Sequence, residues 1–248
     1  MSKYNSADVG YFLIGPYDLR DTSDKFEVSA TKEVKDTTPF GVDSIQYEQP
    51  NMRAFTISGH DGWYDSAATS NAKAMVDLAS GEHVLMLAHE GNTMGKRCHA
   101  AGGTIKSEFK ASPTVGDFTR AAIDVAVSGD LDSALIVLAL ASVSGDGNSE
   151  AAYLDLGAAG VGAAGANVYM ACTAIALTGS TNLIVTLEDS TDHITFADHT
   201  AFTALTAVGA EKKVATDMTV NRYLAVKRVF TGLAGTPTAT FTVAVKVN

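Results

Sequence analysis

Several features that usually mark a secreted protein, a membrane protein or an enzyme are missing from this sequence of 248 residues. Its two cysteines, Cys98 and Cys172, stand far apart, so there is neither a disulfide framework nor a CxxC motif. We expect both thiols to be buried and to act as small hydrophobic side chains. No basic segment followed by an apolar run opens the chain, so we expect no secretory signal.

Long hydrophobic runs are also missing. The longest stretch without a charged residue, Leu156 to Leu187, would be long enough to cross a bilayer. It is interrupted by small and polar residues at Gly157, Gly160, Gly162, Gly165, Asn167, Gly179 and Asn182. This pattern is typical of a glycine-rich loop followed by strands, so we predict no membrane helix.

Charge of either sign is scarce, and the balance is acidic. Charged residues make up 19% of the chain and hydrophobic residues 46%, which is enough apolar material for a core and too little charge for a disordered protein. The net charge of −10 repels phosphate, so we expect no tight nucleic-acid binding. Lys212-Lys213 and Lys227-Arg228 are the basic spots of the second half, and we interpret them as partners of local carboxylates.

No catalytic motif is complete. His89-Glu90 is not followed by the second histidine of HExxH, and there is no GxSxG, P-loop lysine or activated cysteine. Gly160 to Gly165 matches GxGxxG, with Glu188-Asp189 at a suitable distance. However, Asn167 to Leu177 favours a strand where a dinucleotide site needs a helix. We therefore predict that the protein is not an enzyme and holds no cofactor.

Three further polar groupings are weak candidates for a site. Asp146 to Glu150 alternates oxygen-bearing side chains as a calcium loop does, but its glycine is misplaced and its distal acid is missing. His193 and His199 would meet only across a turn, and we interpret them as surface polar residues. His60-Asp61 beside Trp63 could line a pocket, although Trp63 is better interpreted as a packing anchor. We predict no metal site.

Residues 1–145 show mainly strand patterns. One helix is predicted from Asp65 to Ser80, with Asp65 or Ser66 as N-cap, small apolar residues along one face and Gly81 after its end. Leu135 to Leu140 is apolar on both faces and predicts a central strand or an interface. Gly59 to Gly62 predicts a turn. The other expected strands are Tyr11–Ile14, Lys25–Lys35, Ala54–Ser58, Val84–Ala88, Ala121–Val127 and a pair within Lys96–Phe109 that turns at Gly102-Gly103.

Residues 150–248 have a different texture. Ser144 to Ser149 is the best candidate for a linker. Beyond it, alternating strands are expected around Leu183–Glu188, Tyr223–Phe230 and Phe241–Val247, separated by turn signals. Short strands with frequent turns predict a separate antiparallel β-sandwich.

Four segments of the chain resemble siphophage tail tube subunits. They are YFLIGPYDL (11–19), EVKDTTPFGVDSIQYEQPNMRAFTISGHDGWYDS (33–66), HEGNTMGKR (89–97) and TVNRYLAVKRVFTGLAGTPTATFTVAV (219–245). The last of these resembles the β-sandwich that some of these proteins carry as an appended domain. One departure is that Val42 to Ile45 stands where a tryptophan often follows the glycine loop of the family.

The resemblance implies a mainly β fold: a tail-tube-like β-sandwich or partial barrel in residues 1–145 with one flanking α-helix, followed by a second antiparallel β-sandwich in residues 150–248. It implies a virion protein, made in the host cytoplasm, that polymerises into stacked hexameric rings around a conduit for phage DNA. Its partners would be other copies of itself, other tail proteins such as the tape measure and terminator, and the genomic DNA passing through the lumen without sequence-specific binding. No membrane partner is implied.

Within this hypothesis, the polar loop from Lys35 to Gln49 is the expected assembly element. Its proline and apolar phenylalanine suit docking on a neighbouring subunit. The candidate assembly residues are Asp36, Thr38, Pro39, Phe40, Gly41 and Tyr47. Trp63 and Asp65 are the expected structural anchors of the following turn and helix.

Two other functions remain open. A capsid decoration or adaptor protein would also be acidic, rich in strands and without catalytic residues. A carbohydrate-binding module would need an exposed aromatic platform, for which the second half offers no tryptophan and only Tyr153, Tyr169 and Tyr223.

Overall fold

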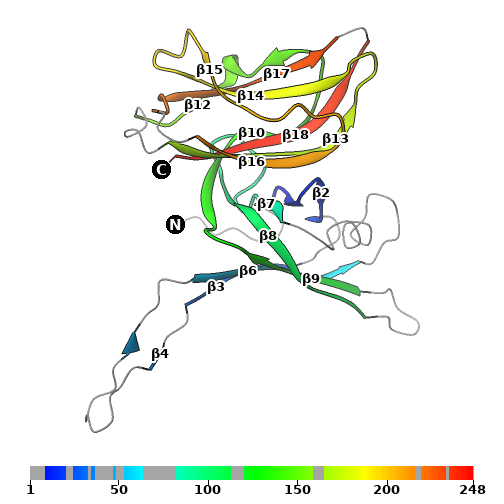
Figure 1. Ribbon diagram of the computed structural model, residues 1–248, viewed down its shortest axis with the longest axis vertical. Helices are drawn as coiled ribbons and strands as arrows, with labels where there is room; N and C mark the ends of the chain where they lie inside the picture. The colour runs from blue at the N-terminus through cyan, green and yellow to red at the C-terminus, as the bar shows by residue number, and fades with distance from the viewer. Residues whose placement is uncertain are drawn as a thin grey trace.

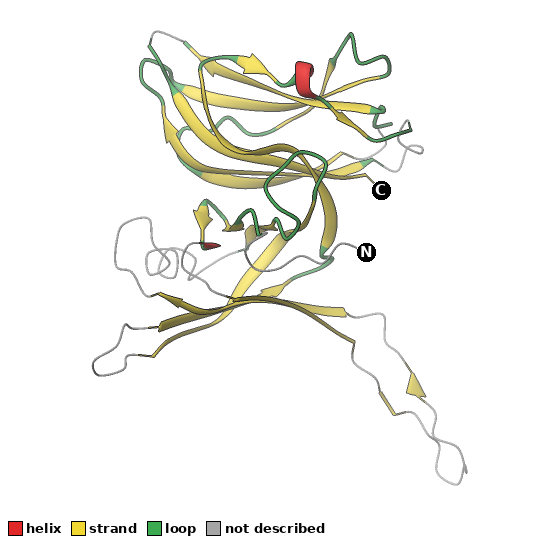
Figure 2. Ribbon diagram, turned by 180° about the vertical axis from the view of Figure 1, so that it is seen from behind, coloured by secondary structure: helices red, strands yellow, loops and turns green. Residues whose placement is uncertain are grey.

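Strands form almost all of the regular structure, as Figures 1 and 2 show. The computed structural model describes residues 9–20, 25–32, 35–36, 47–48, 53–63, 82–112, 120–158, 165–215, 219–232 and 235–247. The predicted fold class, mainly antiparallel β with a sandwich and a partial barrel, is confirmed. The predicted helix Asp65–Ser80 lies outside the described residues.

The elements follow one another in this order: β1 (Phe12–Ile14), β2 (Tyr17–Asp18), β3 (Lys25–Lys32), β4 (Lys35–Asp36), β5 (Tyr47–Glu48), β6 (Arg53–Trp63), β7 (His83–Leu87), β8 (Arg97–Ser112), β9 (Arg120–Val127), β10 (Asp132–Ser144), β11 (Gly147–Asn148), the 3-10 helix η3 (Glu150–Ala152), β12 (Leu154–Asp155), β13 (Ala166–Ala176), β14 (Asn182–Ser190), β15 (Ala197–Ala201), β16 (Gly209–Ala215), β17 (Tyr223–Thr231) and β18 (Thr238–Val247).

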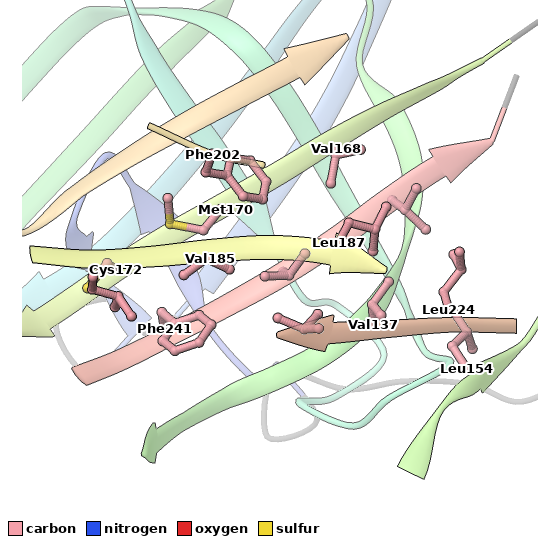
Figure 3. Close-up of a cluster of buried hydrophobic side chains, with 14 of the residues drawn as sticks. Val137, Leu154, Val168, Met170, Cys172, Val185, Leu187, Phe202, Leu224 and Phe241 are labelled. Carbon is pink, nitrogen blue, oxygen red and sulfur yellow. The ribbon is translucent and has the colours of Figure 1, made fainter. Parts of the chain in front are cut away.

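Two sheets face each other in the upper part of Figure 1. One contains β16-β13-β18-β10 and the other β11-β17-β14-β15, with β12 also paired to β17. Alternate side chains of each strand point between the sheets, so Leu224 and Val226 of β17 are buried there while Tyr223 and Ala225 point to the outer face. Figure 3 shows this core, in which each fully buried large apolar side chain contributes about 1.5–3 kcal/mol.

Strand β10 belongs to this sandwich although it precedes residue 145. Along one edge it pairs with β18, with Ile136 opposite Ala244, and along the other it pairs with β8, with Ala134 opposite Cys98. The predicted central strand is therefore confirmed. β10 thus pairs with a strand of the second half, and the division of the chain at residues 145–150 stays a prediction.

The larger sheet curls around a second apolar cluster, formed from β1, β7, β8, β10, β13 and β18. Cys98, Tyr11 and Tyr169 are fully buried in it. The Tyr169 hydroxyl and the Asn167 side-chain amide both donate to Oδ2 of Asp132, which ties the start of β10 to β13. Burial raises the pKa of the Cys98 thiol to about 12. Cys172 is fully buried in the sandwich core, so the interpretation of both cysteines as small hydrophobic residues is confirmed.

Below the sandwich, the distal half of β8 leads into a four-stranded antiparallel sheet with the order β3-β6-β9-β8. Ile57 of β6 and Ile123 and Val125 of β9 point to one face, where they pack with Phe12, Leu85 and other residues of β1 and β7. β8 is 16 residues long and takes part in both regions, which connects them through one continuous backbone.

Two predicted turns at glycines are wrong. Gly102-Gly103 lies inside the single strand β8. The Lys212 stem crosses Gly102 so closely that a Cβ there would lie 2.2 Å from Cδ of Lys212, which accounts for a glycine at this position. Gly59 to Gly62 lies inside β6, with an irregularity in its pairing to β9 at these glycines. Gly102 thus allows a close approach by Lys212, and Gly59 and Gly62 flank a strand irregularity. Neither pair of glycines reverses the chain.

The predicted linker is also wrong as a free connection. Asp146 Oδ1 accepts a hydrogen bond of 2.7 Å from the backbone N–H of Phe230, and Ser149 Oγ accepts one of 2.8 Å from that of Val226. Both bonds attach the segment to β17. The Asp146–Glu150 segment, which includes β11, is thus held against the sheet.

The side chain of Asn92 holds the turn between β7 and β8 against β10. Its Nδ2 donates to the carbonyl of Leu140 at 2.9 Å, and its Oδ1 accepts from the N–H of Leu140 at 2.7 Å. Leu140 lies where the register between β10 and β18 shifts, so the amide supplies partners that the neighbouring strand does not.

We expect Asn92→Ala to lower the free energy of unfolding by about 1–3 kcal/mol, because both backbone groups of the half-buried Leu140 lose their partners. Chemical denaturation followed by circular dichroism would measure this. Asn148→Ala, at an exposed position of β11, is the control and should change stability by less than about 0.5 kcal/mol. Equal stability of both variants would contradict this role of Asn92.

Candidate functional site

The predicted assembly loop is the far part of a β-hairpin. β3 and β6 form the base of this hairpin, and β4 and β5 pair further out, with Asp36 opposite Tyr47. Figures 1 and 2 place β4 well away from the sandwich. Thr38, Pro39, Phe40 and Gly41 lie outside the described residues. Two of the candidate residues are thereby paired across the hairpin, and the role of all six in assembly stays a prediction.

The predicted structural anchors are Trp63 and Asp65. Trp63 is the last residue of β6 and pairs with Arg120 of β9, and its role as an anchor stays a prediction. His60, which we considered with it as a pocket residue, pairs with Lys25 of β3. Asp65 lies outside the described residues.

The four-stranded sheet has two unlike faces. Opposite its apolar face, Glu27 is exposed, and Ser58 and Asp124 are partly exposed. These three residues stand in one cross-strand row, which the register continues to Glu108 of β8. The carboxylates of Glu27 and Asp124 thus stand along the row on the side away from the core.

Both ends of this sheet are edges among the described residues. β3 pairs only with β6, and residues 105–112 of β8 pair only with β9. Val28 of β3 lies opposite Ile57 and so points to the apolar face, yet it is 38% exposed while Ile57 is fully buried. The core therefore stops one strand short of the edge, and an uncovered apolar edge strand is a surface on which another strand can pair.

The outer face of the five-stranded sheet carries a group of aromatic rings that we name the aromatic cluster: Tyr153, His193, Phe196 and Tyr223. The rings of Tyr153 and His193 stack with centroids 5.5 Å apart, and Tyr223 meets each of them edge-on at 5.1 and 5.2 Å. Phe196 lies 6.3 Å from Tyr153. Tyr223 is almost buried, Tyr153 and Phe196 are partly exposed, and His193 is exposed.

An ion pair borders the aromatic cluster. Arg222 donates from Nε and Nη2 to the two carboxylate oxygens of Asp155, at 2.7 and 2.8 Å, and its guanidinium lies 4.9 Å from the ring centroid of Tyr223. The Arg222 hydrogen bonds, followed by the backbone N–H of Gly157, lower the pKa of Asp155 to about 2. Both side chains of the pair remain about two-fifths exposed, at 41% and 39%.

A loop from Ser190 to Phe196 places His193 in the cluster. Asp192 Oδ1 accepts from the backbone N–H groups of Ile194 and Thr195 at 2.9 and 3.0 Å, and from the Ser190 hydroxyl at 2.9 Å. These bonds lower the pKa of Asp192 to about 2. His193 has a φ of 56°, which is uncommon outside glycine and which the bonded loop maintains.

A buried carboxylate lies next to the cluster on the same face. Glu188 is two residues from Ser190, the partner of Tyr223, and is 4% exposed. Its Oε1 lies 3.7 Å from Nζ of Lys227, while its Oε2 has no hydrogen-bond partner among the residues that the structure describes. Burial, and then the charge of Glu150, raise the pKa of Glu188.

The other sequence candidates do not combine into a site. His199 bonds Thr200 and is not brought to His193. A strand, β13, follows Gly165, so the strand expected from Asn167 onward is confirmed. Tyr169 is buried in the curled sheet. Within the described ranges, no group of three or more potential ligands is arranged to hold a metal, and no helix is both long and apolar enough to cross a membrane.

A groove of about 400 Å³ lies where β16 approaches β7 and β8. Its polar lining comes mainly from Glu82, His83, Glu211 and Lys212. The Lys212 ammonium lies 5.5 Å from the ring centroid of Tyr169, and Glu211 is paired with Lys213 at 2.8 Å. As predicted, Lys213 and likewise Lys227, which bonds Asp198 at 2.8 Å, balance local carboxylates.

Sequence reasoning missed the aromatic cluster. Tyr153 and Tyr223 were the recognised candidates for an aromatic platform, but His193 and Phe196 were not linked to them. The spacing along the chain gives no signal, since the members come from the segment before β12, the loop after β14 and the start of β17. The local sequence does predict the loop from Ser190 to Phe196, because Asp192 favours an Asx turn.

Comparisons with known proteins give no family. No family model and no curated protein matches the chain. A chain of the virion of a native gene transfer agent (GTA) particle is similar over 53% of this chain and 98% of its own length, with 15% identity and a TM-score of 0.39. A chain from the tail of an empty GTA particle with C6 symmetry gives the same coverage, with 13% identity and a TM-score of 0.39.

A third similar structure is the SPP1 Dit protein, whose description names the hub adsorption apparatus of phages that infect Gram-positive hosts. The similarity covers 95% of this chain and 98% of that chain, with 11% identity and a TM-score of 0.33. TM-scores this low carry no argument about function.

The ion pair between Arg222 and Asp155 allows a direct test of what lowers the pKa of Asp155. Arg222→Leu should raise the pKa of Asp155 from about 2 toward its ordinary value of 3.8, since the largest cause of the shift is removed. Because the folded-state pKa is depressed, the stabilisation is present above about pH 4 and is lost as the pH falls toward 2. NMR titration of the carboxyl carbons would measure the change.

Asp192 is the internal control in the same titration, because backbone N–H groups and a serine hydroxyl, and not Arg222, lower its pKa. Its pKa should stay at about 2 in the variant. An unchanged Asp155, or a shift of both carboxylates together, would contradict the assignment.

Proposed function

We propose that this protein is a structural virion protein, the major subunit of a phage tail tube that polymerises into stacked hexameric rings around a conduit for DNA. The observation that carries the proposal is the four-stranded sheet β3-β6-β9-β8, which has a polar and an apolar face and an edge at each end. The similar structures are themselves virion or tail components, but the proposal does not rest on them.

Ring formation follows from the two edges. β3 and the distal half of β8 are different surfaces, so the pairing of β3 in one subunit with β8 in the next is a heterologous contact. Where the rotation between neighbours closes, repetition of such a contact forms a ring and covers both edges of this four-stranded sheet. Four strands from each of six subunits, spaced about 4.8 Å apart, would give a barrel roughly 40 Å across before tilt.

The polar face would line the lumen of this barrel. The row of Glu27, Ser58 and Asp124 places carboxylates along it, and the apolar face remains on the core. Carboxylates repel phosphate, so DNA would pass without binding. The overall charge of −10 agrees with such a conduit.

Each remaining part of the chain would have its own role in the tube. Residues 1–145 would build the tube, and the hairpin from Lys35 to Gln49 would reach a neighbouring subunit or ring. Residues 150–248 would lie on the outside. Partners would be further copies of the chain and other tail proteins such as the tape measure and terminator, all within the virion.

Val28→Lys tests the edge contact. A charge on the uncovered edge strand should block pairing by another strand, so we expect a folded protein that forms no rings or tubes. Negative-stain electron microscopy of the purified protein would measure assembly, and tubes about 100 Å wide are expected for the unchanged chain.

Val214→Lys is the matched control, since Val214 is 56% exposed on β16, the opposite edge strand of the larger sheet. It should assemble normally. Tubes from the Val28 variant, or an unchanged chain that stays monomeric even when seeded, would refute the edge contact. Antibody labelling of particles separates a tail tube from a capsid decoration protein.

Removal of the hairpin tests its separate role. A variant without residues 35–49 should remain a folded monomer by circular dichroism and should fail to polymerise. A variant of unchanged length, with glycine and serine in place of Thr38 to Gly41, separates the contribution of the tip from that of hairpin length. Normal tubes without the hairpin would show that assembly does not need it.

A further inference from the structure

We propose that the aromatic cluster on the outer face of the five-stranded sheet binds a neutral pyranose sugar. The proposal stands apart from tube assembly, because it uses none of the residues of the β3-β6-β9-β8 sheet. It rests on three observations: exposed ring surface, exposed hydrogen-bonding groups at its border, and a loop that is already held in place.

The rings provide the apolar part of the site. Tyr223 forms the floor, and Tyr153, His193 and Phe196 present ring surface to solvent above it. The apolar C–H groups on one face of a pyranose match the electron-rich face of an aromatic ring. A mostly aromatic surface with a few placed polar groups is the usual composition of a small-molecule site.

The ion pair provides the polar part. Arg222 uses Nε and Nη2 on Asp155, which leaves further N–H groups of a partly exposed guanidinium beside the rings. Oδ1 of Asp155 already accepts from Arg222 and from the N–H of Gly157, whereas Oδ2 accepts from Arg222 alone and can accept a further hydroxyl group.

The loop is prepared for binding. The bonds of Asp192 fix the chain on both sides of His193, including its left-handed backbone conformation. A ligand would therefore not have to order this segment, which lowers the entropic cost of binding. Strained residues held by their surroundings are found preferentially at functional sites.

The size and charge of the surface favour a sugar over other ligands. The exposed parts of these rings offer roughly 100–200 Å², which suits one or two pyranose rings and is far below the ~800 Å² per partner of a stable protein interface. Asp155, Asp192, Glu188 and Asp198 outnumber Arg222 and Lys227, so anionic sugars and phosphates are disfavoured.

The test is saturation-transfer NMR and calorimetry on the full chain, with neutral hexose and N-acetylhexosamine oligomers as probes and polygalacturonate as the anionic comparison. We expect at least one neutral oligomer to bind, with saturation transferred from the aromatic protons. Tyr153→Ala should weaken binding at least tenfold, whereas Tyr153→Phe, which keeps the ring, should stay within about threefold.

Two more variants keep the proposal falsifiable if Tyr153→Ala fails to fold. Arg222→Leu should also weaken binding. Ile194→Ser, at the 77% exposed tip of the same loop, should not. The proposal is overturned if no neutral oligomer binds at 10 mM-scale concentrations, if only the anionic polymer binds, or if a folded Tyr153→Ala or Arg222→Leu variant binds as tightly as the unchanged chain.

Discussion

The pairing of β10 with β18 is the contact on which the rest of the structure depends. β10 supplies Val137 to the sandwich core on one face of its sheet and Ile136 to the curled-sheet core on the other. Along its other edge it pairs with β8, and β8 continues into the four-stranded sheet. A strand at this position connects the four-stranded sheet to the sandwich through continuous backbone pairing.

Function is distributed over the parts of this framework that the cores do not cover. The apolar cores bury the interior faces of all the sheets, which leaves edges and outer faces for interaction. The edge of β3 is proposed for contacts between subunits, the carboxylate row for the lumen, and the aromatic cluster for sugar.

The sequence predicted what local periodicity determines and missed what tertiary contacts determine. The alternation around Leu224 and Val226 located β17 because each inward residue meets the same core. Gly102-Gly103 was misread as a turn, because its reason is the stem of Lys212, more than a hundred residues away. The aromatic cluster was only half recognised, since Tyr153 and His193 meet solely through the packing of β12, β14 and β17. The helix and hairpin tip stay predictions.

Native-state hydrogen exchange of the intact chain tests the central claim most directly. If β10 and β18 are one structural unit, the amides that pair Ile136 with Ala244 and Leu138 with Val243 will exchange through the same opening, with the same free energy as global unfolding. Slow exchange in β18 combined with a separate, lower-energy opening of β10 would contradict the claim, because the sandwich would then persist without its N-terminal strand.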